Sequence, residues 1–169
     1  MTDKIVLVTL GDPGGVGPEV ALKAHVQLVD RQLVLVGDTS VVRRALDLLD
    51  LRQTLNEISS TNEADFRSGI VNVLSTNTLE AEAVSAPTAQ GGKASAEYIK
   101  RAVEVILGGD AHALVTAPIS KEALKLAGVD FSGHTELLAH LTSTTEYAMM
   151  LCGGPLRVIL VTIHVPLKD

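Results

Sequence analysis

Short apolar runs recur along the chain and predict strands. Continuous, largely β-branched runs of strand length are typical of strands buried on both faces of a sheet. Runs of this kind occupy Ile5–Thr9, Leu33–Val36 and Ala113–Thr116, and Ile70–Leu74 is a further candidate. The sequence therefore predicts a mostly parallel sheet.

The segments between these runs have apolar residues at helical spacing. A helix is predicted over Pro18–Leu28, where proline stands in the first turn and its missing N–H costs nothing. Asp38 or Thr39 is a suitable cap for a second helix that reaches about Asp50. Longer and shorter helices are predicted at Ser95–Leu107, Ser120–Leu126 and Thr135–Leu141, and a loop at Asn77–Gln90. Strands and helices that alternate in this way predict an α/β fold with helices on both faces of the sheet.

The last part of the chain has a different pattern. Tyr147–Leu151 and Leu156–Ile163 are strand-like, and only four residues separate them. So short a connection suits an antiparallel hairpin, with the second strand expected to be buried. We therefore expect a first α/β domain over residues 1–128 and the incomplete beginning of a second domain over 129–169.

Composition narrows the class of protein. Apolar residues make up 46% and aromatic residues 2% of the chain, so the core must be aliphatic. The formal net charge of −6 argues against nucleic acid as a partner. The single cysteine, Cys152, fits a reducing compartment, and neither a signal peptide nor a membrane span is visible. A cytoplasmic protein with no membrane partner is expected.

Two turns at strand ends are candidate ligand loops. Gly11, Asp12 and Gly14 lie in a glycine-rich turn that leads from a strand to a helix, where free backbone N–H groups attract anions. A tight turn that needs glycine only for its backbone angles is the simpler alternative. Thr116 and Lys121 flank the second turn and are able to hold a carboxylate or a phosphate. Helix capping by the neighbouring serine explains that turn equally well.

Two histidines are candidates for chemistry. His134 and Thr135 open a predicted helix after a glycine, and a histidine there is able to carry a proton or hold a substrate. His164 stands where a strand ends before a proline, from which it could bind a metal. One histidine does not make a metal site. Taken alone, the position of His134 favours an ordinary surface histidine, and that of His164 favours a hydrogen-bonded histidine at a strand end.

Taken together and in order, these segments resemble a known family. The shared motifs are Gly11-Asp-Pro-Gly-Gly-Val-Gly-Pro-Glu19, Val115-Thr-Ala-Pro-Ile-Ser-Lys121, Gly133-His-Thr-Glu136, Met149-Met-Leu151, Leu156-Arg-Val158 and Thr162-Ile-His-Val-Pro-Leu-Lys-Asp169. They resemble the 4-hydroxythreonine-4-phosphate dehydrogenase (PdxA) family. The resemblance covers the whole chain but only about the amino-terminal half of a member, and Gly15 stands where alanine is usual.

The resemblance implies a fold and a reaction. The fold would be the two-domain α/β architecture of isocitrate and isopropylmalate dehydrogenases, here truncated, with its active site at a homodimer interface. The reaction would be oxidation of 4-phosphohydroxy-L-threonine by NAD or NADP, followed by decarboxylation to 3-amino-2-oxopropyl phosphate for pyridoxal 5′-phosphate synthesis. A divalent metal (zinc, magnesium or cobalt) would be held by three histidines. His164 matches one of them, and His134 and Thr135 match the substrate-binding pair.

The same resemblance leaves other functions open. A paralogue that oxidises another hydroxy acid, such as D-erythronate 4-phosphate or a cis-dihydrodiol carboxylate, would share these motifs. A truncated, non-catalytic remnant that binds a phosphorylated metabolite is an alternative from a different class. The resemblance assigns no catalytic residue, and the other two metal histidines have no counterpart here, so we expect the chain alone to be inactive.

Overall fold

A five-stranded parallel sheet forms the centre of the molecule. The computed structural model describes residues 4–79, 87–162 and 166–168. The strands lie in the order β3-β4-β2-β1-β5, and every neighbouring pair is parallel. They are β1 (Ile5–Thr9), β2 (Gln32–Gly37), β3 (Thr54–Ile58), β4 (Ile70–Ser75) and β5 (Ala113–Thr116). The four predicted parallel strands are thus confirmed.

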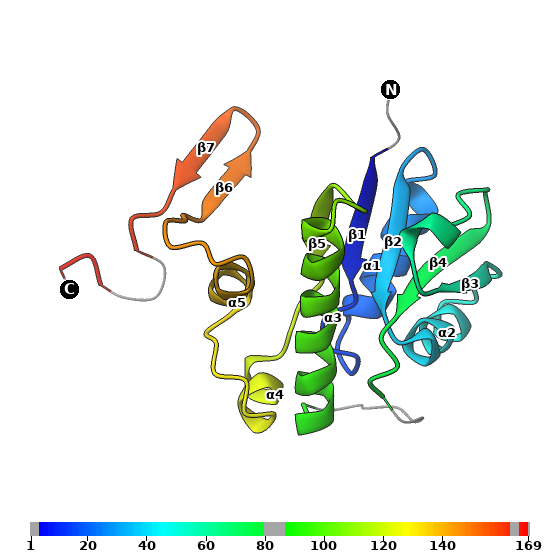
Figure 1. Cartoon of the computed structure of the whole chain (residues 1–169), viewed down its shortest axis with the longest axis horizontal. Helices are drawn as coiled ribbons and strands as arrows, with labels where there is room; N and C mark the ends of the chain where they lie inside the picture. Colours follow the sequence, from blue (N-terminus) through cyan, green and yellow to red (C-terminus); the bar gives the residue numbers. More distant parts are fainter. Residues whose placement is uncertain (1–3, 80–86, 163–165, 169) are drawn as a thin grey trace.

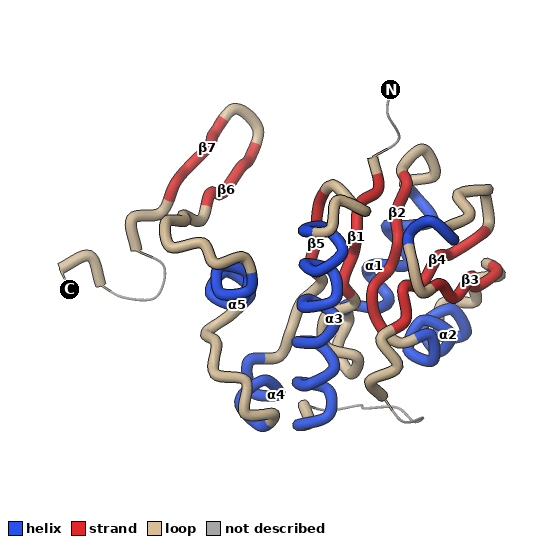
Figure 2. The backbone as a smooth tube through the Cα atoms, in the orientation of Figure 1, coloured by secondary structure: helices blue, strands red, loops and turns tan. Residues whose placement is uncertain are grey.

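Helices cover both faces of this sheet, as predicted (Figure 1). The long α3 crosses one face, where it packs on β2, β1 and β5, whereas α2 packs on β3 and β4 and contacts α1. Their bounds are α1 (Gly17–Gln27), α2 (Thr39–Leu48), α3 (Ala89–Leu107), α4 (Lys121–Leu126) and α5 (His134–Leu141). Figure 2 shows the strand–helix alternation and the long connection from α5 to the final hairpin. Within the described residues, no helix is long and apolar enough to cross a membrane.

The order of the strands creates a switch point beside β1. From β1 the chain continues to β2 on one side, and it later returns to β5 on the other side. The loops after β1 and β5 therefore leave the same edge of the sheet in neighbouring positions. Ligands of open α/β sheets bind at such points, outside the carboxyl ends of the strands.

The core is aliphatic, with one exception. Side chains from β1, β2 and β4 are almost fully buried, among them Leu7, Val34 and Val73. Tyr98 of α3 is the large aromatic residue in this core and is 0% exposed. A second, smaller cluster joins Ile99 and Val103 of α3 to Leu137 of α5. The helix α5 thus packs on the first α/β unit; the predicted boundary at residue 128 stays a prediction.

One strand was not predicted, and the start of one helix was predicted wrongly. The strand β3 was not expected, because its sequence (TLNEI) has no continuous apolar run; as an edge strand it needs little burial. The helix α3 begins at Ala89 rather than Ser95, because Thr88 caps it by accepting a hydrogen bond from the Gly91 N–H at 3.0 Å. Two glycines in its first turns hid this start, since glycine has a low helix propensity.

The hairpin is confirmed, but it is shorter than predicted. It pairs β6 (Met150–Gly153) with β7 (Leu156–Ile159) in antiparallel fashion. All eight of these residues are exposed, so the expectation of a buried second strand was wrong for its described part. The hairpin stands apart from the five-stranded sheet (Figure 1), and none of the described residues covers either of its faces.

Candidate functional site

The glycine-rich loop after β1 is held in one conformation by its own hydrogen bonds. The carboxylate of Asp12 accepts a hydrogen bond from the Gly14 N–H at 3.0 Å, and the Asp12 carbonyl accepts one from the Gly15 N–H at 2.9 Å. Asp12 is buried. Part of its carboxylate therefore has a structural role, which the sequence-based interpretation as a ligand residue did not include.

This loop contacts the loop after β5 through backbone atoms. The Asp12 N–H donates to the Pro118 carbonyl at 2.9 Å, and the Ala117 N–H donates to the Thr9 carbonyl at 3.0 Å. Gly11 has a φ of +69°, and a Cβ atom there would lie 2.1 Å from the Pro118 oxygen. A side chain at Gly11 is thus excluded twice, by backbone conformation and by space. The glycine allows the two candidate loops to touch.

The second candidate loop leads into α4. Thr116 ends β5 and is half-buried, and Lys121 is the exposed first residue of α4. Ser120 caps that helix, because its hydroxyl accepts a hydrogen bond from the Ala123 N–H at 3.1 Å. The capping alternative is therefore confirmed for Ser120, and it leaves the charge of Lys121 free to act on a ligand.

An open pocket of about 480 Å³ lies next to this loop. Residues of α4 and of the segment before α5 line it: Lys121, Lys125, Gly128, Val129, Asp130, Phe131 and Ser132. Two of these side chains are cationic and one is anionic, so the pocket favours an anion. Lys125 was not singled out from the sequence, where it looks like an ordinary solvated lysine of a short helix.

His134 lies at the start of α5 against the backbone of Ala117. Its Nε2 atom is buried and has no hydrogen-bond partner among the described residues. Burial lowers the pKa of His134, and a hydrogen bond with the backbone of Ala117 acts in the opposite direction. The unpartnered Nε2 atom makes this ring a candidate for binding a group that the described residues do not supply.

The structure thus brings three predicted segments together around Ala117 and Pro118. The glycine loop contacts Pro118, and His134, which follows both loops in the sequence, contacts Ala117. Thr135 is the second residue of α5 and is half-buried. His164, the predicted metal ligand, lies outside the described residues.

A buried pair that the sequence did not reveal lies at the end of β2. The hydroxyl of Tyr98 donates to the carboxylate of Asp38 at 2.6 Å, and the same carboxylate accepts from the Thr78 N–H at 2.7 Å. Burial and the neighbouring Asp38 carboxylate raise the pKa of Tyr98 far above its ordinary value. Asp38 does stand at the start of α2 as predicted, but its side chain makes no cap hydrogen bond. It ties α3 and the loop after β4 to the end of β2 instead.

A divalent metal needs several ligands that converge on one point. A group of three or more His, Cys, Asp and Glu side chains placed to hold a metal does not occur among residues 4–79, 87–162 and 166–168. The described part of the chain alone therefore does not fit the three-histidine site that the resemblance implies.

Comparison with known proteins gives a consistent result. A family described as pyridoxal phosphate biosynthetic protein PdxA matches residues 29–169. The 4-hydroxythreonine-4-phosphate dehydrogenase of Desulforapulum autotrophicum is 41% identical over 177 residues, which cover 100% of this chain and 52% of the relative. The D-threonate 4-phosphate dehydrogenase of Salmonella typhimurium is 40% identical over 173 residues, which cover 99% of this chain and 53% of that relative.

Solved structures agree with these relatives. A crystal structure of a 4-hydroxythreonine-4-phosphate dehydrogenase from Burkholderia phymatum matches with a TM-score of 0.89 and 35% identity, covering 98% of this chain and 52% of that one. A terephthalate 1,2-cis-dihydrodiol dehydrogenase from Burkholderia xenovorans matches with a TM-score of 0.74 and 27% identity. This match covers 98% of this chain and 50% of that one. The match in fold and the match in sequence together show that the chain belongs to the PdxA family, and it spans about half the length of the relatives it matches.

Proposed function

We propose that this chain forms one wall of the active-site cleft of a PdxA-type dehydrogenase. The reaction is oxidation of 4-phosphohydroxy-L-threonine by NAD or NADP with a divalent metal, followed by decarboxylation to 3-amino-2-oxopropyl phosphate for pyridoxal 5′-phosphate synthesis. One observation carries this proposal: the glycine loop, the loop after β5 and His134 converge on Ala117 and Pro118 at the switch point of the sheet. Relatives with the corresponding activity in their names support it.

The chemistry of the converging groups suits a phosphorylated hydroxy acid. The Nε2 atom of His134 is buried and has no partner among the described residues, and we propose that it hydrogen-bonds a hydroxyl group of the substrate. The hydroxyl of Thr135, the next residue of α5, is proposed to make a second hydrogen bond to the substrate. Lys121 and Lys125 line the adjacent pocket and supply positive charge for a phosphate or a carboxylate. In this proposal His134 and Thr135 position the substrate, and the lysines attract its anionic end.

The metal, the dimer and the location are further parts of the proposal. His164 is proposed as one of three histidine ligands of the metal. The other two histidines have no match in this sequence. A homodimer that completes the cleft is proposed from the family resemblance. The net charge of −6 favours a small metabolite over nucleic acid as partner, and a cytoplasmic location fits the single cysteine.

A second substrate is also supported by a specific observation. The D-threonate 4-phosphate dehydrogenase is almost as similar to this chain, at 40% identity, as the 4-hydroxythreonine-4-phosphate dehydrogenase at 41%. The two substrates differ at the position that carries an amino group in one and a hydroxyl in the other. A phosphorylated hydroxy acid is therefore the substrate class, and D-threonate 4-phosphate is the second candidate.

The test is an assay of the whole protein that contains this chain. Reduction of NAD and of NADP is followed with 4-phosphohydroxy-L-threonine, D-threonate 4-phosphate and D-erythronate 4-phosphate, each with zinc, magnesium or cobalt. We expect turnover with the first substrate, and a large loss of kcat/KM in His134→Asn. His112→Asn serves as the control, because His112 is exposed at the other end of β5. Normal kcat/KM in His134→Asn would remove this residue from the site.

The assay also distinguishes an active enzyme from a truncated, non-catalytic remnant. We expect no turnover from the 169-residue chain alone, because its described residues hold no group of three metal ligands. Turnover by the chain alone would show that the two histidine ligands missing from this sequence are not required for the reaction. No turnover by the whole protein with any of the three substrates would favour the non-catalytic alternative.

A further inference from the structure

An arginine of α2 holds the glycine-rich loop after β1. The guanidinium of Arg44 donates a hydrogen bond to the carbonyl of Pro13, which lies 31 positions earlier in the sequence. Pro13 is buried and Arg44 is half-buried. Within the described part of the chain, the Pro13 carbonyl has no other hydrogen-bond partner. Because a buried carbonyl needs a partner, loss of the Arg44 side chain would free this part of the loop to move.

The helix that carries Arg44 is a firm support for this contact. Its apolar face, which includes Val42 and Leu46, is buried, and α2 packs on β3 and β4. Arg43, one position earlier on the same helix, is exposed. Two adjacent arginines therefore differ in environment, and Arg44 is the one that contacts the loop.

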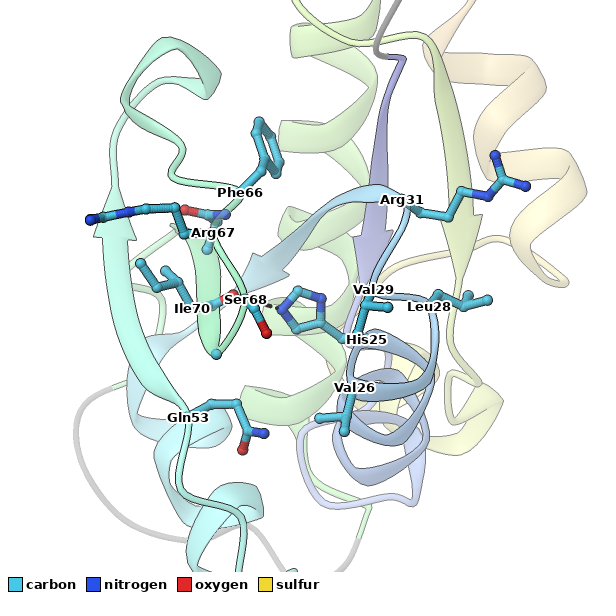
Figure 3. Close-up of a pocket in the computed structure, with 12 residues that line it drawn as sticks. His25, Val26, Leu28, Val29, Arg31, Gln53, Phe66, Arg67, Ser68 and Ile70 are labelled. Carbon is cyan, nitrogen blue, oxygen red and sulfur yellow. Dashed lines mark hydrogen bonds between the residues drawn. The ribbon is translucent and has the colours of Figure 1, made fainter. Parts of the chain in front are cut away.

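The far end of α1, the helix that follows the loop, is fixed independently of Arg44. Nε2 of His25, near the end of α1, lies 3.0 Å from the carbonyl oxygen of Ile70, and the dashed line in Figure 3 marks this hydrogen bond. It joins the helix to the start of β4. A change at Arg44 should therefore act on the loop and leave the far end of α1 in place.

The charge of Arg44 acts on the same loop. Among residues 4–79, 87–162 and 166–168, no carboxylate forms an ion pair with Arg44. Asp12, which precedes Pro13, carries a buried carboxylate that would repel an anion at the loop. The positive charge that Arg44 places at Pro13 opposes this repulsion.

We propose that Arg44 is a positioning residue, which holds the glycine loop in the geometry that accepts the anionic group of a bound ligand. This inference rests on the proposed function. Arg44 binds Pro13, and the neighbouring Asp12 N–H donates to the Pro118 carbonyl at 2.9 Å, beside the backbone that His134 contacts. The anionic group is a phosphate, of either the hydroxy acid or the nicotinamide nucleotide.

The first test is the kinetics of the whole protein that contains this chain. In Arg44→Ala we expect KM for the hydroxy acid or for the nucleotide to rise at least about tenfold, the effect of losing a hydrogen bond to a charged group. The kcat should change by less than about twofold, because the lost interaction holds the ligand before and during the reaction alike. Measuring both KM values shows which phosphate meets the loop.

Matched variants separate positioning from a general loss of stability. Arg44→Lys keeps the charge and a donor, so its KM should lie between those of wild type and Arg44→Ala, and it serves if Arg44→Ala does not fold. Arg43→Ala removes the adjacent exposed arginine and should have normal kinetics. A purely structural defect lowers the fraction of active enzyme, so it lowers kcat at an unchanged KM.

The second test does not depend on activity. Hydrogen exchange of the whole protein, followed by mass spectrometry of its peptides, reports on the loop amides of Asp12, Gly14 and Gly15, which are hydrogen-bonded in the structure. We expect these amides to exchange faster in Arg44→Ala than in wild type or Arg43→Ala. The peptide that covers the end of α1 should be unchanged, because the contact of His25 with Ile70 is intact.

Three outcomes would overturn the proposal. They are unchanged kinetics in a folded Arg44→Ala, a fall in kcat with both KM values unchanged, and loop exchange equal to that of wild type. If the wild-type protein turns over none of the hydroxy acids, the proposed function fails, and the exchange of the loop amides alone then decides whether Arg44 holds the loop.

Discussion

The contact between the two candidate loops depends on Gly11, and its replacement by alanine is the sharpest test of the site. In Gly11→Ala the new residue must keep a φ of +69°, which costs about 1 kcal/mol for a residue with a Cβ atom. The Cβ atom would also lie 2.1 Å from the Pro118 oxygen and 2.8 Å from the Ala117 oxygen. Both neighbours are backbone atoms, so the loop after β5 must move by about 1 Å or more.

That movement breaks the hydrogen bond from the Asp12 N–H to the Pro118 carbonyl, which contributes about 1 kcal/mol. With the strain of the displaced backbone, we expect Gly11→Ala to lower the free energy of unfolding by about 3 kcal/mol. Gly128→Ala is the matched control. Gly128 has a φ of +72°, but a Cβ atom there would meet nothing within 4 Å, so only the conformational cost of about 1 kcal/mol applies.

Urea unfolding followed by far-ultraviolet circular dichroism measures both variants, since the chain contains no tryptophan for fluorescence. The difference of about 2 kcal/mol between them corresponds to roughly thirtyfold in the unfolding equilibrium. Equal m-values are required for the comparison. If the two variants differ by less than about 0.5 kcal/mol, the close approach of the two loops does not exist in solution.

Three further predictions concern single residues. Gly15→Ala should be neutral or stabilise the chain by up to about 1 kcal/mol in urea unfolding, because a Cβ atom there meets only ordinary contacts from 3.4 Å; a loss above about 1 kcal/mol would contradict this. Tyr98→Phe should lower the free energy of unfolding by about 2 kcal/mol, because it removes a buried donor to Asp38; an unchanged midpoint would show that this hydrogen bond is not formed. An NMR titration should give His134 a pKa below its ordinary value of 6.5, since its ring is half-buried. The unfolded chain then binds the proton more readily than the folded chain, so the free energy of unfolding should fall as the pH drops below about 6.5. This fall should be smaller in His134→Asn. A measured pKa at or above the ordinary value would refute the prediction.

The sequence by itself determined the fold class and the positions of the candidate loops. Strands β1, β2, β4 and β5 were readable because a strand buried on both faces requires a continuous apolar run, which is a local property. The edge strand β3 and the start of α3 were not readable. Edge pairing tolerates polar residues, and the cap at Thr88 overrides the weak helix propensity of the glycines that follow.

Only the tertiary structure decided which groups meet. Nothing in the local sequence indicates that Gly11 touches Pro118 or that His134 lies against Ala117, because these contacts follow from the order of strands in the sheet. The same is true of Asp38, whose sequence context suggests a helix cap, but whose carboxylate binds Tyr98 across sixty positions of the chain. Hydrophobic periodicity specifies elements one at a time, whereas a site at a sheet edge arises from residues that are distant in sequence and become neighbours only when the sheet forms.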